Sequence, residues 1–279
     1  MHGIPILTAR GGGVAEAWEN SLLALDRDGC EIPTMYDQAG DPPSKDCSMS
    51  IVVEEPLAEP MIHKDFPGGL EDLQEYVMEV LEGIKNHLVR DSEDAEDTRW
   101  EYTYNERLFN YTVPSLAGGY DQIAGIVEKL ASTPHSRRAQ AVTWKVWEDN
   151  DCYDPACLQS IWCRITEEEE ELYLSANIRF RSNDAYKAAF MNMFALVRLQ
   201  AEIARRIGEK CGREVKLGRY LHQADSYHLY GSYFREFDER FRGGLARRSF
   251  AERTYHWSEV KDIMEEARPM ILEKARKMG

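Results

Sequence analysis

Two clusters in the sequence carry residue types that suit anion binding and covalent catalysis. Ser136-Arg137-Arg138 follows a segment with helical spacing, and two adjacent guanidiniums can together clasp a phosphate through bidentate hydrogen bonds. Cys157 stands between Asp-Pro-Ala and an alternating apolar stretch. Because the thiolate is the reactive form of cysteine, Cys157 could be a nucleophile if cationic groups stabilise that charge. Considered alone, paired arginines are more often surface charge, and a lone cysteine is more often a buried, inert thiol.

A third cluster, residues 180–184, ends a strand-like run at the point where a helical pattern begins. Its sequence is Phe-Arg-Ser-Asn-Asp, so Arg181 and Ser182 could bind an anion together with unpaired backbone N–H groups. Asn192 follows within the apolar helical pattern. An amide buried there needs hydrogen-bond partners, because an unpaired one costs about 1–3 kcal/mol.

The fourth cluster is the strand-like run 225–230, Asp-Ser-Tyr-His-Leu-Tyr. His228 and Tyr230 are two residues apart, so on a strand they point the same way and suit a ligand that carries hydroxyl groups. Each cluster alone is a weak signal. Together the four clusters suit a ligand with a phosphate, a planar ring and a sugar.

Composition restricts the class of protein. The chain has 279 residues, 43% of them hydrophobic, which suffices for a sizeable core, and no apolar run long enough to span a membrane. The net charge of −15 argues against broad nucleic-acid binding, which needs a basic surface. The amino terminus lacks the apolar region of a signal peptide, and the six cysteines show no CxxC pairing. We therefore expect a cytoplasmic protein with free thiols and no metal site.

Helical spacing predicts three helices in the first half of the chain, over residues 14–28, 70–89 and 121–132. Thr133-Pro134 ends the third. Residues 38–48 are rich in turn formers and predict a loop, with a strand after it over 50–57. The strongly acidic stretch 90–98 is expected to be a solvated loop.

The middle of the chain changes to β-type runs rich in β-branched and aromatic residues, over residues 139–147, 157–165 and 171–182. Glu167–Glu171 falls where the tip of a hairpin belongs. A long apolar helix over 185–207, a strand near 217–224 and a polar helix over 250–279 are expected to follow. Strands mixed with helices without strict alternation predict an α+β fold, with a mixed sheet packed against helices, as a single domain over residues 1–279.

The order and spacing of these motifs resemble thymidylate synthase and its pyrimidine hydroxymethylase relatives. The motifs are DQI…SRR, PAC, RSNDAYKAAFMN and HLY. The resemblance covers residues 100–235 well, is vaguer over 14–90 and is poor at the carboxyl end. The second half is similar to the divergent, archaeal-type branch of thymidylate synthase-like proteins. The resemblance implies a thymidylate synthase-like fold and an enzyme that transfers a one-carbon unit to C5 of a pyrimidine nucleotide.

The resemblance also implies catalytic roles for particular residues. Cys157 stands where the family has its nucleophile, and Tyr104 matches the tyrosine that assists proton removal from C5. Asn192 matches the asparagine that bonds O4 and N3 of uracil and so favours a uridylate substrate. Glu75 would be the glutamate that organises proton transfer to O4. Trp100 would match the tryptophan near the folate.

The other matched residues are implied to bind substrate, and they are Arg137, Arg138, Arg181, Ser182, Asp184, His228, Tyr230 and Lys45. Arg181 and Ser182 would bind the phosphate on their own subunit. The arginine pair would cross to the phosphate on a partner subunit, which implies a homodimer. His228 and Tyr230 would hold the sugar 3′-hydroxyl. Lys45 would replace an arginine of the family's amino-terminal phosphate loop, which reads DPPSKDCSMS in this chain.

The chemistry gives a physical reason for this set of residues. C5 of uracil is a poor nucleophile, and addition of the Cys157 thiolate to C6 turns it into an enolate carbon that attacks a one-carbon donor. Nearby arginines would lower the pKa of the thiol, and Asn192 would stabilise the charge that builds on O4. The implied donor is 5,10-methylenetetrahydrofolate or a related pterin of the tetrahydromethanopterin type. No metal is required.

Two departures from the family pattern leave alternatives open. Leu158 stands where the family commonly has histidine, so the water network near the pyrimidine must differ. The chain ends in EKARKMG, whereas synthases usually finish with an apolar residue whose carboxylate closes over the folate. A less well sealed site would let water replace hydride and yield a hydroxymethyl product.

Three functions therefore remain in view. The leading hypothesis is methylation of dUMP to dTMP. The first alternative is a 5-hydroxymethylase acting on (d)UMP or (d)CMP, and the second is a catalytically silent paralogue that binds a nucleotide. The combination of Cys157, Tyr104 and Asn192 argues against the silent paralogue, because a pure binding protein has no use for the thiol.

Overall fold

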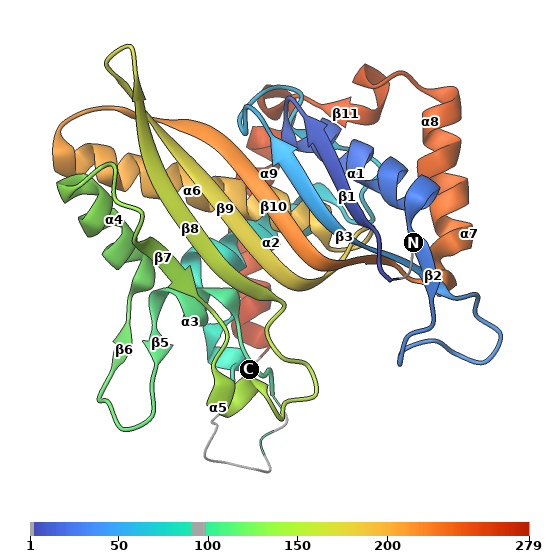
Figure 1. The fold of residues 1–279 in the computed structure, drawn as a ribbon, viewed down its shortest axis with the longest axis horizontal. Coiled ribbons are helices and arrows are strands. Elements are labelled where there is room, and N and C mark those ends of the chain that lie inside the picture. The colour runs from blue at the N-terminus through green and yellow to red at the C-terminus, as the bar shows by residue number, and fades with distance from the viewer. Residues whose placement is uncertain (1–2, 91–96, 98, 279) are drawn as a thin grey trace. The chain divides into compact units, whose positions relative to one another are not determined.

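The computed structural model describes residues 3–90, 97 and 99–278 (Figure 1). Residues 91–96 and 98 of the acidic stretch lie outside the described part of the chain. The contacts divide the chain into two compact units. The first unit comprises residues 1–69, 179–194 and 219–262, and the second comprises 70–178, 195–218 and 263–279. The single domain expected over residues 1–279 stays a prediction.

The described residues form one large mixed sheet of seven strands in the order β1-β3-β10-β9-β8-β7, with β2 beside β3 (Figure 1). The strands are β1 (Ile6–Gly11), β2 (Cys30–Ile32), β3 (Ser44–Val53), β7 (Ala139–Val142), β8 (Leu158–Glu168), β9 (Glu171–Asp184) and β10 (Val215–Leu229). Strands β1 and β3 are parallel, whereas β3 is antiparallel to β2 and β10. The predicted α+β class with a mixed sheet is confirmed.

Two small antiparallel ladders complete the described strands: β4 (Ile62–His63) pairs with β11 (Thr254–Tyr255), and β5 (Tyr111–Thr112) with β6 (Gly119–Tyr120). The helices are α1 (Val14–Asp28), α2 (Leu70–Glu82), α3 (Tyr104–Phe109), α4 (Gln122–Ser132), α5 (Val146–Asp149), α6 (Ala189–Cys211), α7 (Phe234–Glu236), α8 (Gly243–Arg247) and α9 (Trp257–Lys277). Short 3₁₀ and π segments are η1 (Asn86–Leu88), η2 (Gly231–Tyr233), η3 (Phe237–Arg242) and η4 (Ala251–Arg253). No helix in this described set is long and apolar enough to cross a membrane.

In the first unit, the apolar face of α1 packs against β1 and β3. Trp18 is the centre of this core. Its indole is fully buried, donates a 2.9 Å hydrogen bond to the Ala185 carbonyl, and meets the rings of His63, Phe190 and Phe241 edge-on. A buried indole N–H with a partner avoids the cost of an unsatisfied donor. These contacts join α1 to the chain around residue 185 within one core.

In the second unit, α2 packs against α3, and α4 packs against β7. Met78 of α2 forms a buried cluster with Ala267 and Ile271 of α9. The side chain of Gln122, at the start of α4, bonds both polar groups of Val142 at the end of β7. Elements far apart in sequence therefore fix the segment that carries α3.

Several predicted elements have different bounds in the structure, for local reasons. Helix α2 ends at Glu82 and not at 89, because Gly83 adopts φ +66°, a left-handed conformation that stops a helix. The run 139–147 is a strand only to Val142, since Asp149 accepts the backbone N–H of Lys145 at 2.6 Å and starts α5 instead. Helix α6 starts at Ala189, after a turn that Asp184 caps.

Other differences concern strands. Strand β1 was not expected from the sequence, and β3 begins at Ser44, inside the predicted loop 38–48. Strand β10 is longer than the expected 217–224. The hairpin tip predicted at 167–171 is present: β8 and β9 are joined at Glu169 and Glu170, which both have positive φ.

Candidate active site

Cys157 lies immediately before β8, as the sequence indicated. Its side chain is half-buried, and Sγ is 4.0 Å from the Pro155 carbonyl. The next residue, Leu158, donates its backbone N–H to the Tyr104 hydroxyl at 3.2 Å. Tyr104 is the first residue of α3, which Thr103 caps by accepting the N–H of Glu106. The candidate nucleophile and the candidate proton-transfer tyrosine are therefore held together in the second unit.

A second tyrosine, Tyr102, lies beside this pair. Its ring centroid is 5.5 Å from that of Tyr104. Burial raises the pKa of Tyr102, as does the nearby Cys157, while hydrogen bonding to Tyr104 and to the Cys157 backbone opposes the rise. Burial also raises the pKa of Tyr104 well above its usual value, and Tyr102, Tyr76 and Cys157 add to the effect. Both phenols are thus neutral and can donate a proton in a hydrogen bond.

A pocket of about 420 Å³ opens beside Tyr104 in the second unit. Its walls combine aromatic rings with charged groups, and its lining residues are Tyr76, Glu79, Arg99, Trp100, Glu101, Tyr102, Thr103, Tyr104 and Asp154. Aromatic faces suit stacking against a planar heterocycle. Trp100, predicted to lie near a folate, is part of this aromatic wall, and its contact with a cofactor stays a prediction.

Glu75, the predicted catalytic glutamate, lies in a cluster of ion pairs. Its two carboxylate oxygens each lie 2.7 Å from a lysine nitrogen, of Lys85 and of Lys274. Burial alone would raise the pKa of Glu75, but the hydrogen bonds from the two lysines lower it below its usual value. Glu75 does not line the pocket in the described residues; Glu79, one turn further along α2, does.

Glu79 has the electrostatics expected of a proton-transfer carboxyl. Burial raises its pKa above the usual value, although Lys85, 3.0 Å away, opposes the rise. The Lys85 nitrogen also lies 5.3 Å from the centre of the Trp100 ring. A raised pKa keeps a carboxyl protonated closer to neutral pH, where it can act as an acid.

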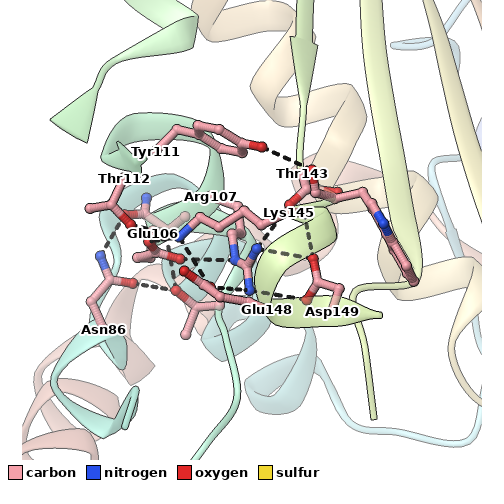
Figure 2. A network of polar contacts seen from close by, with 12 residues as sticks. Asn86, Glu106, Arg107, Tyr111, Thr112, Thr143, Lys145, Glu148 and Asp149 are labelled. Carbon is pink, nitrogen blue, oxygen red and sulfur yellow. Dashed lines mark hydrogen bonds and ion pairs between the residues drawn. The ribbon is translucent and has the colours of Figure 1, made fainter. Parts of the chain in front are cut away.

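A buried ionic network joins α3 to α5, the helix that leads into the Cys157 loop (Figure 2). The Arg107 guanidinium, only 1% exposed, forms two 3.1 Å hydrogen bonds with the Asp149 carboxylate. Glu148 and Glu106 lie 3.1 and 3.2 Å from the same guanidinium. Lys145 donates to Glu106 at 3.1 Å. This network fixes the elements on either side of the Tyr104–Leu158 contact.

Arg137 and Arg138 follow α4 on an exposed loop whose backbone is held by neighbours. The Trp162 indole donates to the Arg137 carbonyl at 3.0 Å, and Lys129 donates to the Arg138 carbonyl at 3.1 Å. Both side chains are exposed, and in the described residues neither guanidinium forms a hydrogen bond or an ion pair. These two adjacent arginines lie on a loop whose backbone is held by hydrogen bonds, and their side chains are available to bind an external anion.

In the first unit, the predicted residues 181–184 lie at the end of β9. Arg181 and Ser182 are half-buried, and Asn192 on α6 is 6% exposed. Asp184 accepts the backbone N–H groups of Tyr186 at 3.0 Å and Lys187 at 2.8 Å. Burial raises the pKa of Asp184 to about 6. Asp184 therefore has a structural role in the turn before α6, and its predicted contact with substrate stays a prediction.

The remaining predicted residues lie on β3 and around the end of β10. His228 and Tyr230 point the same way, as expected: their ring centroids are 4.7 Å apart. Lys45 belongs to β3, not to a loop, and its nitrogen forms a 2.8 Å ion pair with Asp26. The lysine is thus already engaged with a carboxylate, and its predicted phosphate contact stays untested.

Several polar residues were missed in the sequence analysis. Four of them line the pocket beside Tyr104, namely Tyr76, Glu79, Tyr102 and Asp154, and two lie near His228, namely Asp46 and Ser226. Two of them carried a signal. Glu79 repeats Glu75 at the i+4 spacing of one helix face, and Tyr102 repeats Tyr104 at a spacing of two. The described residues contain no group of three or more His, Cys, Asp or Glu side chains arranged to hold a metal ion.

Comparison with known proteins gives a consistent result. The family model described as thymidylate synthase matches residues 73–267. A protein of Methanocaldococcus jannaschii named "Putative thymidylate synthase" is 30% identical over 232 residues, which cover 81% of this chain and 90% of the relative. A protein of the same name from Methanosarcina mazei is 29% identical over 203 residues, covering 73% of this chain and 82% of the relative.

A solved structure shows the same fold. The thermostable thymidylate synthase A from Bacillus subtilis superimposes with a TM-score of 0.58 at 17% sequence identity. The match covers 82% of this chain and 84% of that chain.

Proposed function

Because this chain belongs to the thymidylate synthase family, we propose that it methylates dUMP to dTMP, with Cys157 as the nucleophile. The family supports one-carbon transfer to C5 of a pyrimidine nucleotide and the use of a folate cofactor. One observation carries the proposal: Cys157 lies immediately before β8, directly beside Leu158, whose backbone N–H donates to the Tyr104 hydroxyl. A pure binding protein would not need this pairing of thiol and phenol.

In the proposed reaction, the Cys157 thiolate forms a bond to C6 of uracil. The electrons of the C5–C6 double bond move toward O4, where the amide of Asn192 stabilises the negative charge. C5 would take the one-carbon unit, and the C5 proton would leave with help from the Tyr104 hydroxyl. Its raised pKa keeps that hydroxyl protonated, so it acts by orienting the water or base that takes the proton. In the last step the Cys157–C6 bond breaks as the C5–C6 double bond re-forms, and the thiolate is released.

The pocket beside Tyr104 would hold the cofactor, methylenetetrahydrofolate or a pterin of the tetrahydromethanopterin type. Trp100, Tyr76 and Tyr102 offer aromatic faces to its ring. When bound, the cofactor supplies the one-carbon unit and, for a methyl product, the hydride. The protein's contribution is to orient the ring and to limit the access of water.

Substrate binding would follow the family pattern. We propose that Arg181 and Ser182 bind the phosphate and that His228 and Tyr230 bind the sugar. Arg137 and Arg138 would reach the phosphate of a partner subunit in a homodimer. Their exposed, uncommitted guanidiniums on a firm loop support this role.

One observation favours the alternative product. Besides its rings, the pocket has three carboxylates, of Glu79, Glu101 and Asp154. Carboxylates hold and polarise water, and water reaching the one-carbon unit in place of hydride gives a 5-hydroxymethyl pyrimidine. A 5-hydroxymethylase acting on (d)UMP or (d)CMP is therefore the second candidate.

Tritium release from 5-tritiated dUMP, UMP, dCMP and CMP with methylenetetrahydrofolate tests the proposal, followed by product mass. Release from dUMP with a methyl gain is the expected result, whereas a hydroxymethyl gain selects the alternative. Cys157→Ser should abolish release and the covalent adduct with 5-fluoro-dUMP but keep nucleotide binding. Cys152→Ser, in the same loop, is the matched control. Absence of release and adduct with every nucleotide would leave only a silent nucleotide-binding protein.

A further inference from the structure

Three polar side chains on neighbouring strands of the first unit form a chain of hydrogen bonds that ends at His228. The Ser226 hydroxyl donates to Asp46 Oδ2 at 2.7 Å and lies 3.2 Å from His228 Nδ1. Asp46 belongs to β3, and the other two residues belong to β10. His228 is paired with Asp46 in the ladder, so both side chains face the same side of the sheet.

This pairing depends on a β-bulge in β10. Ala224 is opposite Met49, but Tyr227 is opposite Cys47, so β10 has one residue more than β3 in this interval. In an uninterrupted ladder, Tyr227 and not His228 would be opposite Asp46. The bulge therefore places the imidazole and the carboxylate on one face, with Ser226 between them.

Counting the donors shows which atom carries each hydrogen in the hydrogen bonds between Asp46, Ser226 and His228. Burial lowers the pKa of His228 to about 4, although a hydrogen bond to the Ser226 backbone opposes this shift. At pH 8 the ring is therefore neutral and carries one proton. Burial raises the pKa of Asp46, whereas hydrogen bonds from Ser226 and the Cys47 backbone oppose this rise, and at pH 8 we take the carboxyl as ionised. A serine hydroxyl has one hydrogen, and Ser226 donates it to Asp46. Ser226 can then only accept from His228. The proton of the imidazole must therefore be on Nδ1.

The other ring nitrogen is left as an acceptor. In the described part of the chain, no hydrogen bond involves His228 Nε2, and the Tyr230 ring packs edge-on beside the imidazole. We propose that Asp46 and Ser226 are positioning residues that hold His228 in the Nδ1–H tautomer, so that Nε2 accepts a hydrogen bond from a ligand hydroxyl. Which hydroxyl it accepts rests on the proposed function, where it is the 3′-hydroxyl of the nucleotide.

Strand β10 also contains His222, which has the opposite tautomer, with its proton on Nε2. His222 Nε2 lies 2.8 Å from Asn183 Oδ1, to which it must donate, and its Nδ1 lies 3.1 Å from the Tyr220 hydroxyl. Burial lowers the pKa of His222 to about 3, so this ring is also neutral. His222 is therefore an internal reference for the Nε2–H tautomer in any spectrum of the intact protein.

The decisive measurement is ¹⁵N NMR of the free, full-length protein labelled on its histidine rings, at pH 8. His228→Gln and His222→Gln identify the two pairs of ring nitrogens. The expected result is a protonated Nδ1 on His228 and a protonated Nε2 on His222. A protonated Nε2 on His228 in the wild type would overturn the proposal, whether or not the protein binds a nucleotide.

Two variants test the role of the hydroxyl. Ser226→Ala should move His228 toward the Nε2–H tautomer and leave the His222 signals in place, which also reports that the variant is folded. Ser226→Thr keeps the hydroxyl and should keep the wild-type tautomer. An unchanged His228 spectrum in a folded Ser226→Ala protein would show that Ser226 and Asp46 do not set the tautomer.

Ligand discrimination then tests the acceptor role of Nε2. dUMP should bind about tenfold more tightly than its 3′-fluoro analogue, which cannot donate a hydrogen bond. This preference should shrink in Ser226→Ala, because an Nε2–H ring no longer accepts. An undiminished preference in that variant contradicts the assignment. Failure of both nucleotides to bind counts against the proposed function alone, because the spectra decide the tautomer without a ligand.

Discussion

The Tyr104 hydroxyl accepts a hydrogen bond from the backbone N–H of Leu158, the residue next to the candidate nucleophile. The phenol satisfies a backbone donor at the start of β8, and we propose that it also assists removal of the C5 proton. These roles can be separated by experiment, because stability and turnover are measured independently.

Tyr104→Phe should lower the rate of tritium release by about 10²–10⁴-fold, because it removes the hydroxyl that orients the water or base accepting the C5 proton. It should also cost about 1–3 kcal/mol of stability, because the Leu158 N–H loses its partner. Tyr111→Phe is the matched control, since it removes a 2.8 Å hydrogen bond to the Trp144 carbonyl in the same unit. The rate of tritium release and the free energy of unfolding in urea are measured for both variants. Equal rates of tritium release would show that Tyr104 has a structural role only.

Glu75 and Glu79 should differ in the property they affect. Glu75→Gln removes two ion pairs and should reduce stability by about 1–3 kcal/mol, with little change in the pH profile of the rate. Glu79→Gln should lower kcat and remove the limb of that profile that reports a raised carboxyl pKa. The measurements are kcat against pH and urea unfolding. The reverse result, with the pH profile changed only in Glu75→Gln, would support Glu75 as the catalytic glutamate.

Arg107→Met should be among the most destabilising single changes in the second unit, at about 3–5 kcal/mol. It leaves the buried Asp149 carboxylate without its paired guanidinium. Arg137→Met is the control because Arg137 is exposed, and its effect should stay within about 0.5 kcal/mol. Urea midpoints measure both. A loss below about 1 kcal/mol for Arg107→Met would mean that the network adds little net stability.

Acid should weaken the first unit through Glu19. Burial alone would raise the pKa of Glu19, but hydrogen bonds from His63 and Arg253 lower it below its usual 4.5. A lowered pKa in the folded state stabilises the protein at pH above about 4.5 and loses this effect as pH falls through the folded value. Glu19→Gln should therefore flatten the stability of the protein against pH in this acid range. The free energy of unfolding is measured by denaturant titration at each pH. Equal pH dependence in the wild type and in Glu19→Gln would contradict this prediction.

Subunit mixing tests the proposed crossing of arginines. Cys157→Ser and the double variant Arg137→Ala/Arg138→Ala should each be inactive alone. Refolded together, they should regain about a quarter of the wild-type rate, because half of the random dimers have one complete site. A mixture as inactive as its components, with dimers present by light scattering, would place both arginines on their own subunit's site.

The sequence predicted the parts of the site that depend on local order. Cys157 precedes an alternating apolar run, and that alternation alone indicated a strand beginning beside it. The shared direction of His228 and Tyr230 followed from their spacing of two. These relationships are set within a few residues, so tertiary contacts do not change them.

Relationships set by distant residues could not be predicted. Glu75 and Glu79 are equivalent by helical spacing, and nothing in the sequence indicated that Lys274, 199 residues away, binds Glu75. The run 139–147 has strand composition, yet Asp149 and Arg107 turn its second half into α5. In both cases an ion pair between residues far apart in sequence, and not the local pattern, decides the outcome.

Strand β10 has one residue more than β3 between Ala224 and Tyr227. The direction of the side chains after this interval therefore depends on how many residues it contains as much as on which residues they are. Any natural insertion or deletion of one residue there would reverse the side of the strand on which everything downstream emerges, and His228 and Tyr230 would turn away together. Relatives that keep the histidine but differ by an odd count at this place should therefore have lost the activity. Whether a relative has an even or an odd difference in residue number across these four positions is therefore a simple sequence test for separating active from inactive relatives.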